Sequence, residues 1–371
     1  MSLQFNPNIA ASPIYVGGKS TEEVRSQYGL EEIIKIGSNE NPLPPSPLAV
    51  EAMQRAAAQL NRYPPMGDDD LREALAGSIG RGLSPDHFFS GNGGCDVLWM
   101  IANSFLTAAD ECIICRPTFP IYDATAKRIG AKVVYVDLDP TDFRYDIEAI
   151  LAAVTERTRL VYLCSPNNPT GNHLTAQQLE ALISHLPPHV LVVSDEVYHH
   201  FVTADDIADS LAYVQEGKNL VVVHSFSKVF GLAGLRLGYG IAPVEISRYI
   251  ARMRQPFHLS RVTIEGGIAA LQDRDHIEKT VELVISGRKW LYEQIKALGI
   301  QAWPSQANFV LFQPAMPAPV MAEALLKRGV IVRPLGGFYL PDHIRVTVGL
   351  PGENEQFISA LRQVLEAGTT A

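Results

Sequence analysis

The chain has 371 residues, of which 47% are hydrophobic and 19% are charged, and its formal net charge at pH 7 is -9. This length allows two domains, and the composition excludes a largely disordered chain or an extended coiled coil. The negative charge argues against a nucleic-acid-binding protein, because phosphate backbones are bound by clustered Lys and Arg.

The first segment, MSLQFNPNIAASPIYVGG, has no basic region followed by an apolar core, so it is not expected to be a secretory signal. No apolar run approaches the length of a membrane span, and four cysteines are too few for a disulfide scaffold. We therefore expect a cytoplasmic protein that binds neither membrane nor nucleic acid. The Pro- and Asn-rich stretch SNENPLPPSP that follows is expected to form an arm or a loop.

Short apolar runs then alternate with longer helix-like stretches. The predicted buried strands, rich in Val, Ile, Leu and Tyr, are residues 111–117, 132–138, 159–166, 190–198 and 219–225. Periodic segments lie between them, such as TAQQLEALISHL, which begins at Thr175, a suitable N-cap. Strands that alternate with helices predict a mostly parallel sheet covered on both faces, with ligands bound beyond the carboxyl ends of the strands.

A different pattern begins after about residue 260. A long helical stretch, DHIEKTVELVISGRKWLYEQIKALG, precedes short apolar runs such as ANFVLF and HIRVTVGL, which have helical stretches between them. This order predicts a smaller α+β domain. We expect an N-terminal arm over residues 1–44 that is part of the small domain, a large domain over 45–260, and the C-terminal small domain over 261–371.

Two pairs of residues suggest a metal site but lack further ligands. Cys112 and Cys115 have CxxC spacing inside an apolar strand, and no second Cys or His pair lies nearby to complete a zinc site. We expect both to be reduced core residues. His199 and His200 are adjacent, and they are expected to lie on the surface. The sequence therefore predicts no metal.

Polar residues and glycines follow the predicted strands where the strands end. GNGGCDVLW places glycines before a helix, where backbone N–H groups can bind a phosphate, although such turns also occur for steric reasons alone. The loop SPNNPTG presents the amide of Asn168 at another strand end, although it can equally be a simple turn. Asp195 ends the next strand, and a buried carboxylate there needs water or a cation. Tyr198, three residues further on, can reach the same place.

The stretch HSFSKVFGLAGLRLGYG ends the last of these strands and contains Lys228 with Ser225, Ser227 and Arg236. A lone lysine at a strand end is usually solvated, but a deprotonated lysine amine forms Schiff bases with carbonyl compounds. A pyridine ring that accepts electrons needs a carboxylate at its nitrogen, which Asp195 can supply. A phosphate needs hydroxyls, amides and an arginine. Together these residues meet each requirement of pyridoxal 5'-phosphate.

The motifs SPNNPTG, SDEVY and SFSKVFGLAGLRLGY, in this order, resemble those of the fold-type I aminotransferases, which use this cofactor. The motifs YVGGKSTEEV, RYPP, RPTFPIY, RQPF and IVRPLGGFYLPDHIRVTVGLP extend the resemblance over nearly the whole chain, and they resemble the histidinol-phosphate aminotransferase family in particular. The resemblance implies an α/β fold with a large cofactor-binding domain and a small α+β domain. It also implies a homodimer whose subunits share their active sites.

The resemblance assigns a role to each matched residue. Lys228 would bind the cofactor covalently and act as the general base, and Asp195 would pair with the ring nitrogen. Asn168 and Tyr198 would contact the ring hydroxyl. The other expected cofactor-binding residues are Phe119 on the ring and, around the phosphate, Gly94, Cys95, Ser225, Ser227, Arg236 and Tyr63 of the partner subunit.

The resemblance also implies how the substrates bind. Arg345 would bind the α-carboxylate of an amino acid, and Arg333 would bind the phosphate of histidinol phosphate. Tyr15 and Asn168 would approach the substrate as well. Two arginines and a tyrosine suit a phosphomonoester. The expected reaction is the transamination of L-histidinol phosphate with 2-oxoglutarate, which gives imidazole-acetol phosphate and glutamate in histidine biosynthesis.

Several departures from the family pattern leave the amino donor open. Pro44 replaces a glycine, Cys95 replaces a small acidic residue, and His258 replaces an asparagine. An aromatic amino-acid aminotransferase would share every cofactor-binding residue, and a phosphothreonine decarboxylase would also bind a phosphate. A regulator that only binds the cofactor is a further alternative, but such regulators carry a basic DNA-binding domain ahead of this fold.

Overall fold

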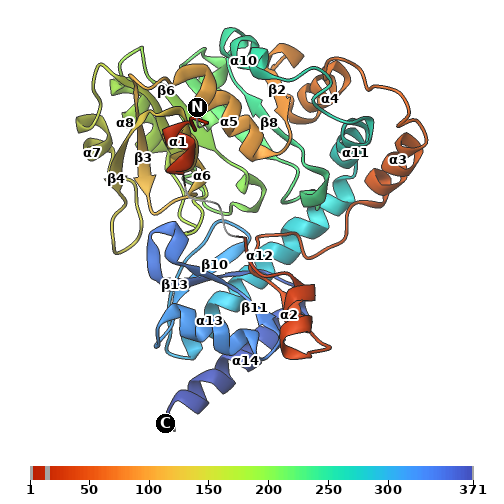
Figure 1. The fold of residues 1–371 in the computed structure, drawn as a ribbon, viewed down its shortest axis with the longest axis vertical. Coiled ribbons are helices and arrows are strands. Elements are labelled where there is room, and N and C mark those ends of the chain that lie inside the picture. The colour runs from red at the N-terminus through yellow and green to blue at the C-terminus, as the bar shows by residue number, and fades with distance from the viewer. Residues whose placement is uncertain (1–2, 13–16, 370–371) are drawn as a thin grey trace.

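The described chain folds into two lobes, which are joined by the long helix α12 (Arg274–Ala297) (Figure 1). The structure is a computed structural model that describes residues 3–12 and 17–369. The larger lobe contains a seven-stranded sheet, and the smaller lobe contains a four-stranded sheet and a two-stranded one. The predicted α/β fold with a smaller α+β part is confirmed.

The larger sheet contains all five strands predicted from the apolar runs. Its strands are β2 (Phe88–Gly91), β3 (Glu111–Arg116), β4 (Lys132–Asp137), β5 (Thr158–Cys164), β6 (Leu191–Asp195), β7 (Leu220–Ser225) and β8 (Gly238–Ile241). Their order is β2-β8-β7-β6-β5-β3-β4, and only β8 runs antiparallel to its neighbours. The sequence did not predict β8, which is short and rich in glycine. A Cβ at Gly240 would lie 2.1 Å from the ring of Phe89, so the strand has room only for glycine there.

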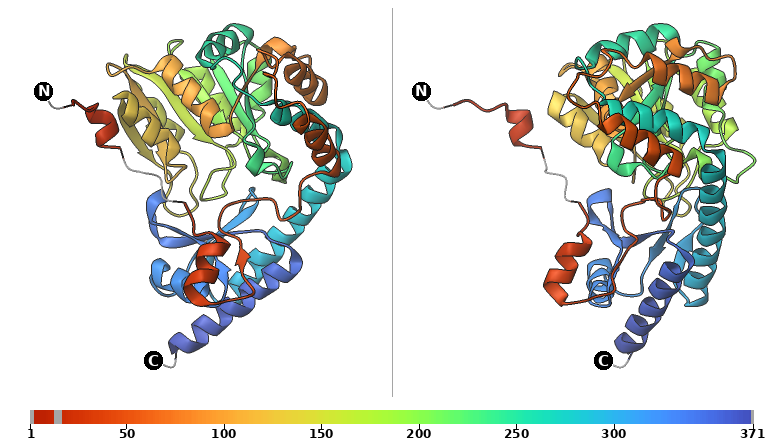
Figure 2. Two further views of the ribbon diagram at one scale, coloured as in Figure 1. Left: turned by 45° about the vertical axis from the view of Figure 1, so that its right-hand side comes forward. Right: turned by 90° about the vertical axis from the view of Figure 1, so that its right-hand side faces the viewer.

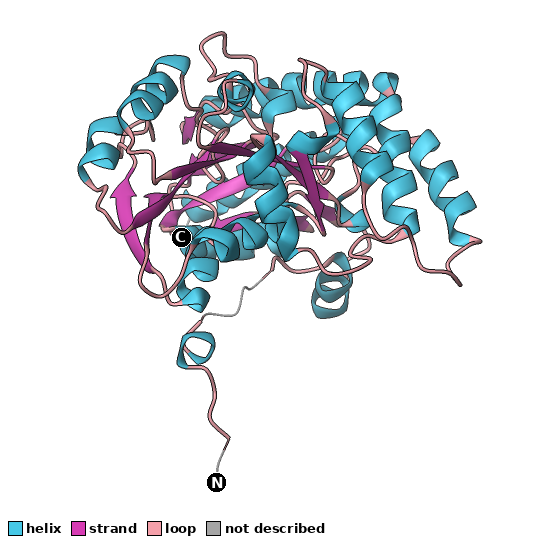
Figure 3. Cartoon of the chain, turned by 90° about the horizontal axis from the view of Figure 1, so that it is seen from above, coloured by secondary structure: helices cyan, strands magenta, loops and turns pink. Residues whose placement is uncertain are grey.

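Helices cover both faces of this sheet (Figure 3). They are α3 (Pro47–Ala57), α4 (Asp69–Ile79), α5 (Gly94–Phe105), α6 (Ile121–Ile129), α7 (Ile147–Ala152), α8 (Ala176–His185), α9 (Ser210–Gln215), α10 (Val244–Ile250) and α11 (Arg261–Gln272). Alternate residues of one strand enter two separate cores: Val222 packs on one face, and Val221 and Val223 pack on the other. Thr175 caps α8 as predicted, and its side chain accepts a hydrogen bond from the N–H of Gln178.

The smaller lobe is built from both ends of the chain. Its antiparallel strands are β9 (Gln301–Trp303), β10 (Phe309–Gln313), β12 (Arg333–Leu335) and β13 (Leu340–Thr347), in the order β12-β13-β10-β9. Its helices are α2 (Thr21–Tyr28), α13 (Ala318–Leu326) and α14 (Pro351–Thr369). The segment expected to be an arm contributes β1 (Ile34–Lys35), which pairs in parallel with β11 (Val330–Ile331). In Figure 2, α12 runs from the larger lobe along the smaller one, where α14 packs beside it.

The remaining helices are short. α1 (Pro7–Ala10) packs on α6, and the 3-10 turns are Pro85–His87, His199–Phe201, Ala233–Leu235, Ala251–Met253 and Gly336–Phe338. Within residues 3–12 and 17–369, none of the helices combines the length and apolar character that a membrane span needs.

The packing of α11 bears on where the two lobes divide. This helix packs against α3 and α4 of the larger lobe, and a Cβ at Gly266 would lie 2.7 Å from the side chain of Met53. By its packing, α11 belongs to the larger lobe. We therefore propose that the boundary lies near residue 273, between α11 and α12, and not at residue 260 as the sequence pattern suggested.

The cysteines with CxxC spacing lie inside the larger sheet. Cys112 and Cys115 are buried and unpaired, as predicted, and burial raises the pKa of each thiol to about 12. They are therefore protonated core residues at neutral pH.

Candidate active site

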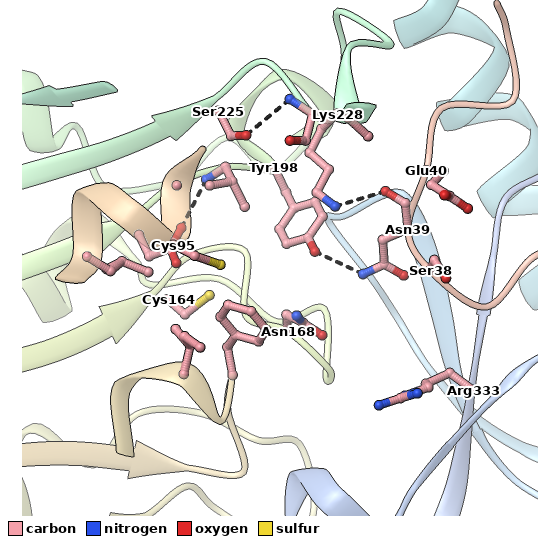
Figure 4. A pocket seen from close by; sticks show the side chains of 18 of the residues that line it. Ser38, Asn39, Glu40, Cys95, Cys164, Asn168, Tyr198, Ser225, Lys228 and Arg333 are labelled. Atoms are coloured by element: carbon pink, nitrogen blue, oxygen red, sulfur yellow. Dashed lines mark hydrogen bonds between the residues drawn. The ribbon is translucent and has the colours of Figure 1, made fainter. Parts of the chain in front are cut away.

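A cavity of about 520 Å³ lies between the two lobes, at the carboxyl ends of the parallel strands (Figure 4). The larger lobe contributes residues after β5, β6 and β7 and at the start of α5, and the smaller lobe contributes residues from β12 and β13 and the loop after β1. Most residues predicted for the site line it: Gly94, Cys95, Phe119, Asn168, Asp195, Tyr198, Ser225, Ser227, Lys228, Arg236, Arg333 and Arg345.

Lys228 extends into this cavity from the turn after β7. Its amine donates a hydrogen bond to the carbonyl of Asn39 at 3.0 Å and lies 5.3 Å from the ring centre of Tyr198. Burial, together with the positive charge of Arg345, lowers the pKa of Lys228 to about 8. A substantial fraction of the amine is therefore neutral near physiological pH, which is the form that attacks a carbonyl group.

Asp195 ends β6 and is only 3% exposed. Tyr122 donates a hydrogen bond to its Oδ2 at 2.6 Å, and the N–H of Val197 lies 3.4 Å from its Oδ1. Burial raises the pKa of this carboxyl to about 6 in spite of these donors. A buried carboxylate at the cavity wall, without a paired cation in the described chain, suits the protonated nitrogen of a bound ring.

Asn168 and Tyr198 line the same cavity (Figure 4). The amide of Asn39 donates to the hydroxyl oxygen of Tyr198 at 2.9 Å, and Arg345 donates to the Oδ1 of Asn168. Tyr198 and Asn168, the two residues predicted to contact the hydroxyl of the cofactor ring, are thus each hydrogen-bonded to a residue of the smaller lobe. These bonds orient both side chains at the cavity wall.

The glycine loop and Arg236 form a concave wall at one end of the cavity. Gly93 has a φ of +87°, and a Cβ there would lie 2.4 Å from the guanidinium of Arg236. Gly238 on β8 is as close, because its Cβ would lie 2.5 Å from the backbone of Gly93. Ser225 accepts from the N–H of Ser227 at 3.1 Å on the same side. Backbone N–H groups, two hydroxyls and a guanidinium around a wall that only glycine allows suit a phosphate.

Two arginines face each other at the opposite end. Arg333 on β12 and Arg345 on β13 are direct cross-strand partners, and both guanidinium groups lie 5.5 Å from the ring centre of Phe338. Arg345 is 4% exposed and donates to the carbonyl of Gly37 at 3.0 Å. Like charges directly opposite in a sheet are destabilising. A pair kept at a cavity wall therefore indicates a site for an anion.

Among the predicted residues that the structure describes, Tyr63 does not line the cavity. Tyr63 is 79% exposed and stacks on Phe257, with ring centres 4.7 Å apart. Its predicted role in the cavity of a partner subunit stays a prediction. Tyr15 lies outside the described residues.

Sequence reasoning missed Asn39 and Tyr122, which hold Tyr198 and Asp195 in place. A signal existed for each residue. Asn39 lies in the SNENPLPPSP stretch, which was expected only to form an arm or a loop, and Tyr122 follows Phe119 by three residues in the RPTFPIY motif, at the start of α6.

A cluster of histidines lies next to the cavity wall. The prediction that His199 and His200 are surface residues is wrong, because both are half-buried and the ring centre of His199 lies 3.8 Å from those of His200 and His224. Burial lowers the pKa of His224 to about 3. Glu196 lies beside them, with its Oε2 3.8 Å from Nε2 of His224. In the described part of the chain, no group of three or more such side chains has the arrangement of a metal site.

The fold, the lysine after β7, the carboxylate at the end of β6 and the anion-binding wall define a transferase of fold type I, whose members use pyridoxal 5'-phosphate. Residues 31–361 match the family described as aminotransferase class I and II. The chain belongs to this family and is an aminotransferase.

Curated relatives cover almost the whole chain. The chain is 41% identical over 353 residues to the histidinol-phosphate aminotransferase of Moorella thermoacetica, which covers 95% of this chain and 90% of that protein. It is also 41% identical over 354 residues to the histidinol-phosphate aminotransferase of Symbiobacterium thermophilum, with 95% and 96% covered.

Solved structures share the same fold. The histidinol-phosphate aminotransferase of Sinorhizobium meliloti, in complex with pyridoxal-5'-phosphate, superposes with a TM-score of 0.88 at 27% identity and covers 99% of each chain. The aspartate aminotransferase of Thermus thermophilus with maleate gives a TM-score of 0.83 at 26% identity, with 98% of this chain and 99% of that chain covered.

Proposed function

We propose that this aminotransferase transfers the amino group of L-histidinol phosphate to 2-oxoglutarate, giving imidazole-acetol phosphate and glutamate, in histidine biosynthesis. The facing pair Arg333 and Arg345 is the observation that carries this proposal, because a phosphomonoester needs more positive charge than an uncharged donor side chain does. Relatives at 41% identity that are named for this reaction support it.

We propose that the cavity residues hold pyridoxal 5'-phosphate in the roles implied by the sequence. Bound in the cavity, the cofactor supplies an electron sink for the charge left when an α-proton is removed. Lys228 would bind its aldehyde carbon, Asp195 would keep the ring nitrogen protonated, and Asn168 and Tyr198 would contact the ring hydroxyl. Phe119 would stack on the ring, and the phosphate would lie among Gly94, Cys95, Ser225, Ser227 and Arg236.

Lys228 would then transfer the proton, and Arg333 and Arg345 would bind the substrates. The neutral amine of Lys228, with a pKa of about 8, is matched to removing and returning a proton near pH 7. Arg333 would bind the phosphate of the donor, and Arg345 and Arg333 would afterwards bind the carboxylates of 2-oxoglutarate, with Asn168 at the side of Arg345. Two substrates that use one cavity in turn predict ping-pong kinetics.

We also propose a cytoplasmic homodimer in which Tyr63 reaches the phosphate in the cavity of the neighbouring subunit. Tyr63, Met66 and Leu60 are 79%, 72% and 56% exposed, which is a large apolar surface for three residues of one loop. A partner that covers them removes this surface from water. The family resemblance gives the same arrangement.

An aromatic amino-acid donor is the alternative that a particular observation favours. The rings of Phe338, Phe309 and Phe119 lie at or near the two arginines and the cavity wall, and they would also pack on an aromatic side chain. The two donors differ in their anionic group: histidinol phosphate carries a phosphate, for which Arg333 is proposed, whereas an aromatic amino acid carries an α-carboxylate, for which Arg345 is proposed.

Half-reactions with separate donors distinguish these proposals. Histidinol phosphate should convert the bound cofactor to its amine form at a concentration about 10- to 100-fold lower than phenylalanine does. Arg333→Gln should weaken the response to histidinol phosphate by a similar factor and leave that to phenylalanine nearly unchanged. Absorbance titration of the holoenzyme measures both effects.

The matched control for this titration is Arg362→Gln, which changes an exposed arginine on α14 away from the cavity. Phosphothreonine serves as the third donor, and release of carbon dioxide from it would identify a decarboxylase. A clear preference for phenylalanine would refute histidinol phosphate as the donor and would favour an aromatic amino-acid aminotransferase.

The pKa of Lys228 predicts how cofactor binding depends on pH. The rate at which the apoprotein binds the cofactor covalently should rise with pH and level off above about 8, because only the neutral amine reacts. Arg345→Gln should shift the midpoint to higher pH, since the positive charge that disfavours protonation is removed. Stopped-flow absorbance measures the rate, and a wild-type midpoint near 10.5, the ordinary lysine value, would contradict the assignment.

A further inference from the structure

A buried polar cluster, centred on Asp68, lies outside the cavity at the end of the loop between α3 and α4 that contains Tyr63. Asp68 is 1% exposed, and its Oδ1 accepts hydrogen bonds from Arg72 at 3.1 Å and from Arg254. Its Oδ2 accepts from the hydroxyl of Ser90 at 2.5 Å. A carboxylate is costly to bury without partners, and here two guanidinium groups and a hydroxyl supply them.

Ser90 and His258 connect this cluster to the glycine loop. The hydroxyl of Ser90 has one proton, which it donates to Asp68, so it accepts from Nε2–H of His258 at 3.0 Å. The carbonyl of His258 accepts from the side chain of Asn92 at 3.0 Å. Asn92 precedes Gly93, so the cluster holds the loop that forms the phosphate-binding wall. The departure at His258 noted in the sequence is thus the link between Ser90 and that loop.

The same cluster is also connected to Tyr63, through Arg254 and Phe257. Arg254 donates to Asp68, and three residues later Phe257 stacks on Tyr63 with an angle of 24° between the rings. Phe257 has a φ of +56°, a left-handed conformation that is strained for a residue with a side chain. We call Tyr63 and Phe257 the aromatic ledge. Phe257 thus orients the exposed ring of Tyr63, and we infer that this orientation suits contact with a partner subunit.

The charges within the cluster are consistent with this connection. Burial raises the pKa of Asp68, but Arg254, the hydrogen bond from Ser90, and Arg72 outweigh it and hold the pKa below its usual value. Burial lowers the pKa of His258, so its ring is neutral near pH 7 and one nitrogen carries a proton to donate. Asp68 therefore stays a carboxylate that binds Arg254 on one side and Ser90 on the other.

We propose that Asp68 is a positioning residue that acts on two phosphate sites at once. Through Ser90 and His258 it holds the glycine loop of its own cavity, and through Arg254 it holds the aromatic ledge that the proposed homodimer presents to the neighbouring cavity. This inference rests on the proposed function, because it assumes the cofactor and the shared-site dimer. Asp68 itself touches neither the cofactor nor the substrate.

The first test compares two ligands that differ only in the phosphate. Asp68→Asn should weaken equilibrium binding of pyridoxal 5'-phosphate by about 10- to 100-fold. It should leave binding of pyridoxal, which lacks the phosphate, within about twofold. Fluorescence titration of the apoprotein measures both affinities. The matched control is Asp69→Asn: Asp69 is adjacent, exposed and also bound to Arg72, and its loss should change neither affinity.

The inference would be overturned if Asp68→Asn weakened the binding of both ligands equally, or the binding of neither. Should Asp68→Asn fail to fold, Ser90→Ala decides the question, because it cuts the link to the glycine loop and leaves Asp68 paired with two arginines. Ser90→Ala should show the same selective loss of phosphate-dependent binding, and unchanged binding would refute the role of Asp68 in the loop.

Hybrid dimers test the action on the neighbouring cavity. In a dimer with one Lys228→Ala subunit, only the other cavity can bind the cofactor covalently. Asp68→Asn placed on the Lys228-containing subunit tests the glycine loop, and Asp68→Asn placed on the Lys228→Ala subunit tests the ledge. Mass spectrometry after borohydride reduction measures covalent capture, which should fall in both arrangements at limiting cofactor.

If covalent capture fell in only one of the two hybrid dimers, the proposal that Asp68 acts on both phosphate sites would be refuted. Wild-type protein that captures no cofactor, or that is a monomer, would instead refute the proposed function, so the two failures are distinguishable.

Discussion

A Lys228→Ala variant should lose turnover with every amino donor by about 10,000-fold or more, because alanine can neither bind the cofactor nor move the α-proton. No other lysine lines the cavity in the described chain, so no second amine can replace it. The protein should stay folded, since Lys228 makes one side-chain hydrogen bond, to the carbonyl of Asn39. Steady-state rates measure the loss of turnover, and a cooperative unfolding transition shows that the variant is folded.

Lys218→Ala is the matched control, because Lys218 is exposed and lies in the turn before β7. Its turnover should equal that of the wild type. Substantial turnover by Lys228→Ala with any donor would show that another group performs the proton transfer, and the proposed mechanism would be wrong.

An Asp195→Asn variant should lose activity and gain stability. Turnover should fall by about 100- to 1,000-fold, because an amide has no negative charge to keep the ring nitrogen protonated. The apoprotein should be more stable above pH 6, because the variant no longer buries an unpaired charge. The expected gain is at most about 3 kcal/mol, from a carboxyl pKa raised from 3.8 to about 6.

The pH dependence of unfolding checks the sign of this effect. Because the folded protein holds the proton of Asp195 more tightly than the unfolded chain does, the wild type loses stability as pH rises from 3.8 to about 6. The variant lacks this loss, so the two stability curves should separate over that range. Asp205→Asn, which changes an exposed carboxylate, should follow the wild type. Parallel curves for Asp195→Asn would contradict the buried-charge assignment.

The residues that the sequence predicted best lie at the ends of parallel strands. Asp195 ends β6, and Asn168 and Lys228 follow β5 and β7; the topology of a parallel sheet brings these ends to one edge without further information. Apolar runs bounded by polar residues are strong local signals, so both the strands and the cavity edge could be predicted.

Features that depend on tertiary packing were not predicted. Arg333 and Arg345 were recognised from their motifs, but their cross-strand pairing depends on the register of β12 and β13. Asn39 is brought to Tyr198 by a chain reversal that no local pattern encodes. The prediction for His199 and His200 was wrong because adjacent polar residues predict a surface, whereas His199, in a 3-10 turn, packs on His224 of β7.

The pairing of β1 with β11 has a consequence for the order in which the protein can form. Ile34 pairs with Val330, so about 300 residues of chain separate two neighbours in one sheet, and contacts this distant form late. A nascent chain that has emerged as far as β8 has every strand of the larger sheet. It still lacks Arg333 and Arg345. During synthesis, the half of the cavity that holds the lysine is therefore complete first, and the half that carries the two arginines follows only after β12 and β13 have left the ribosome.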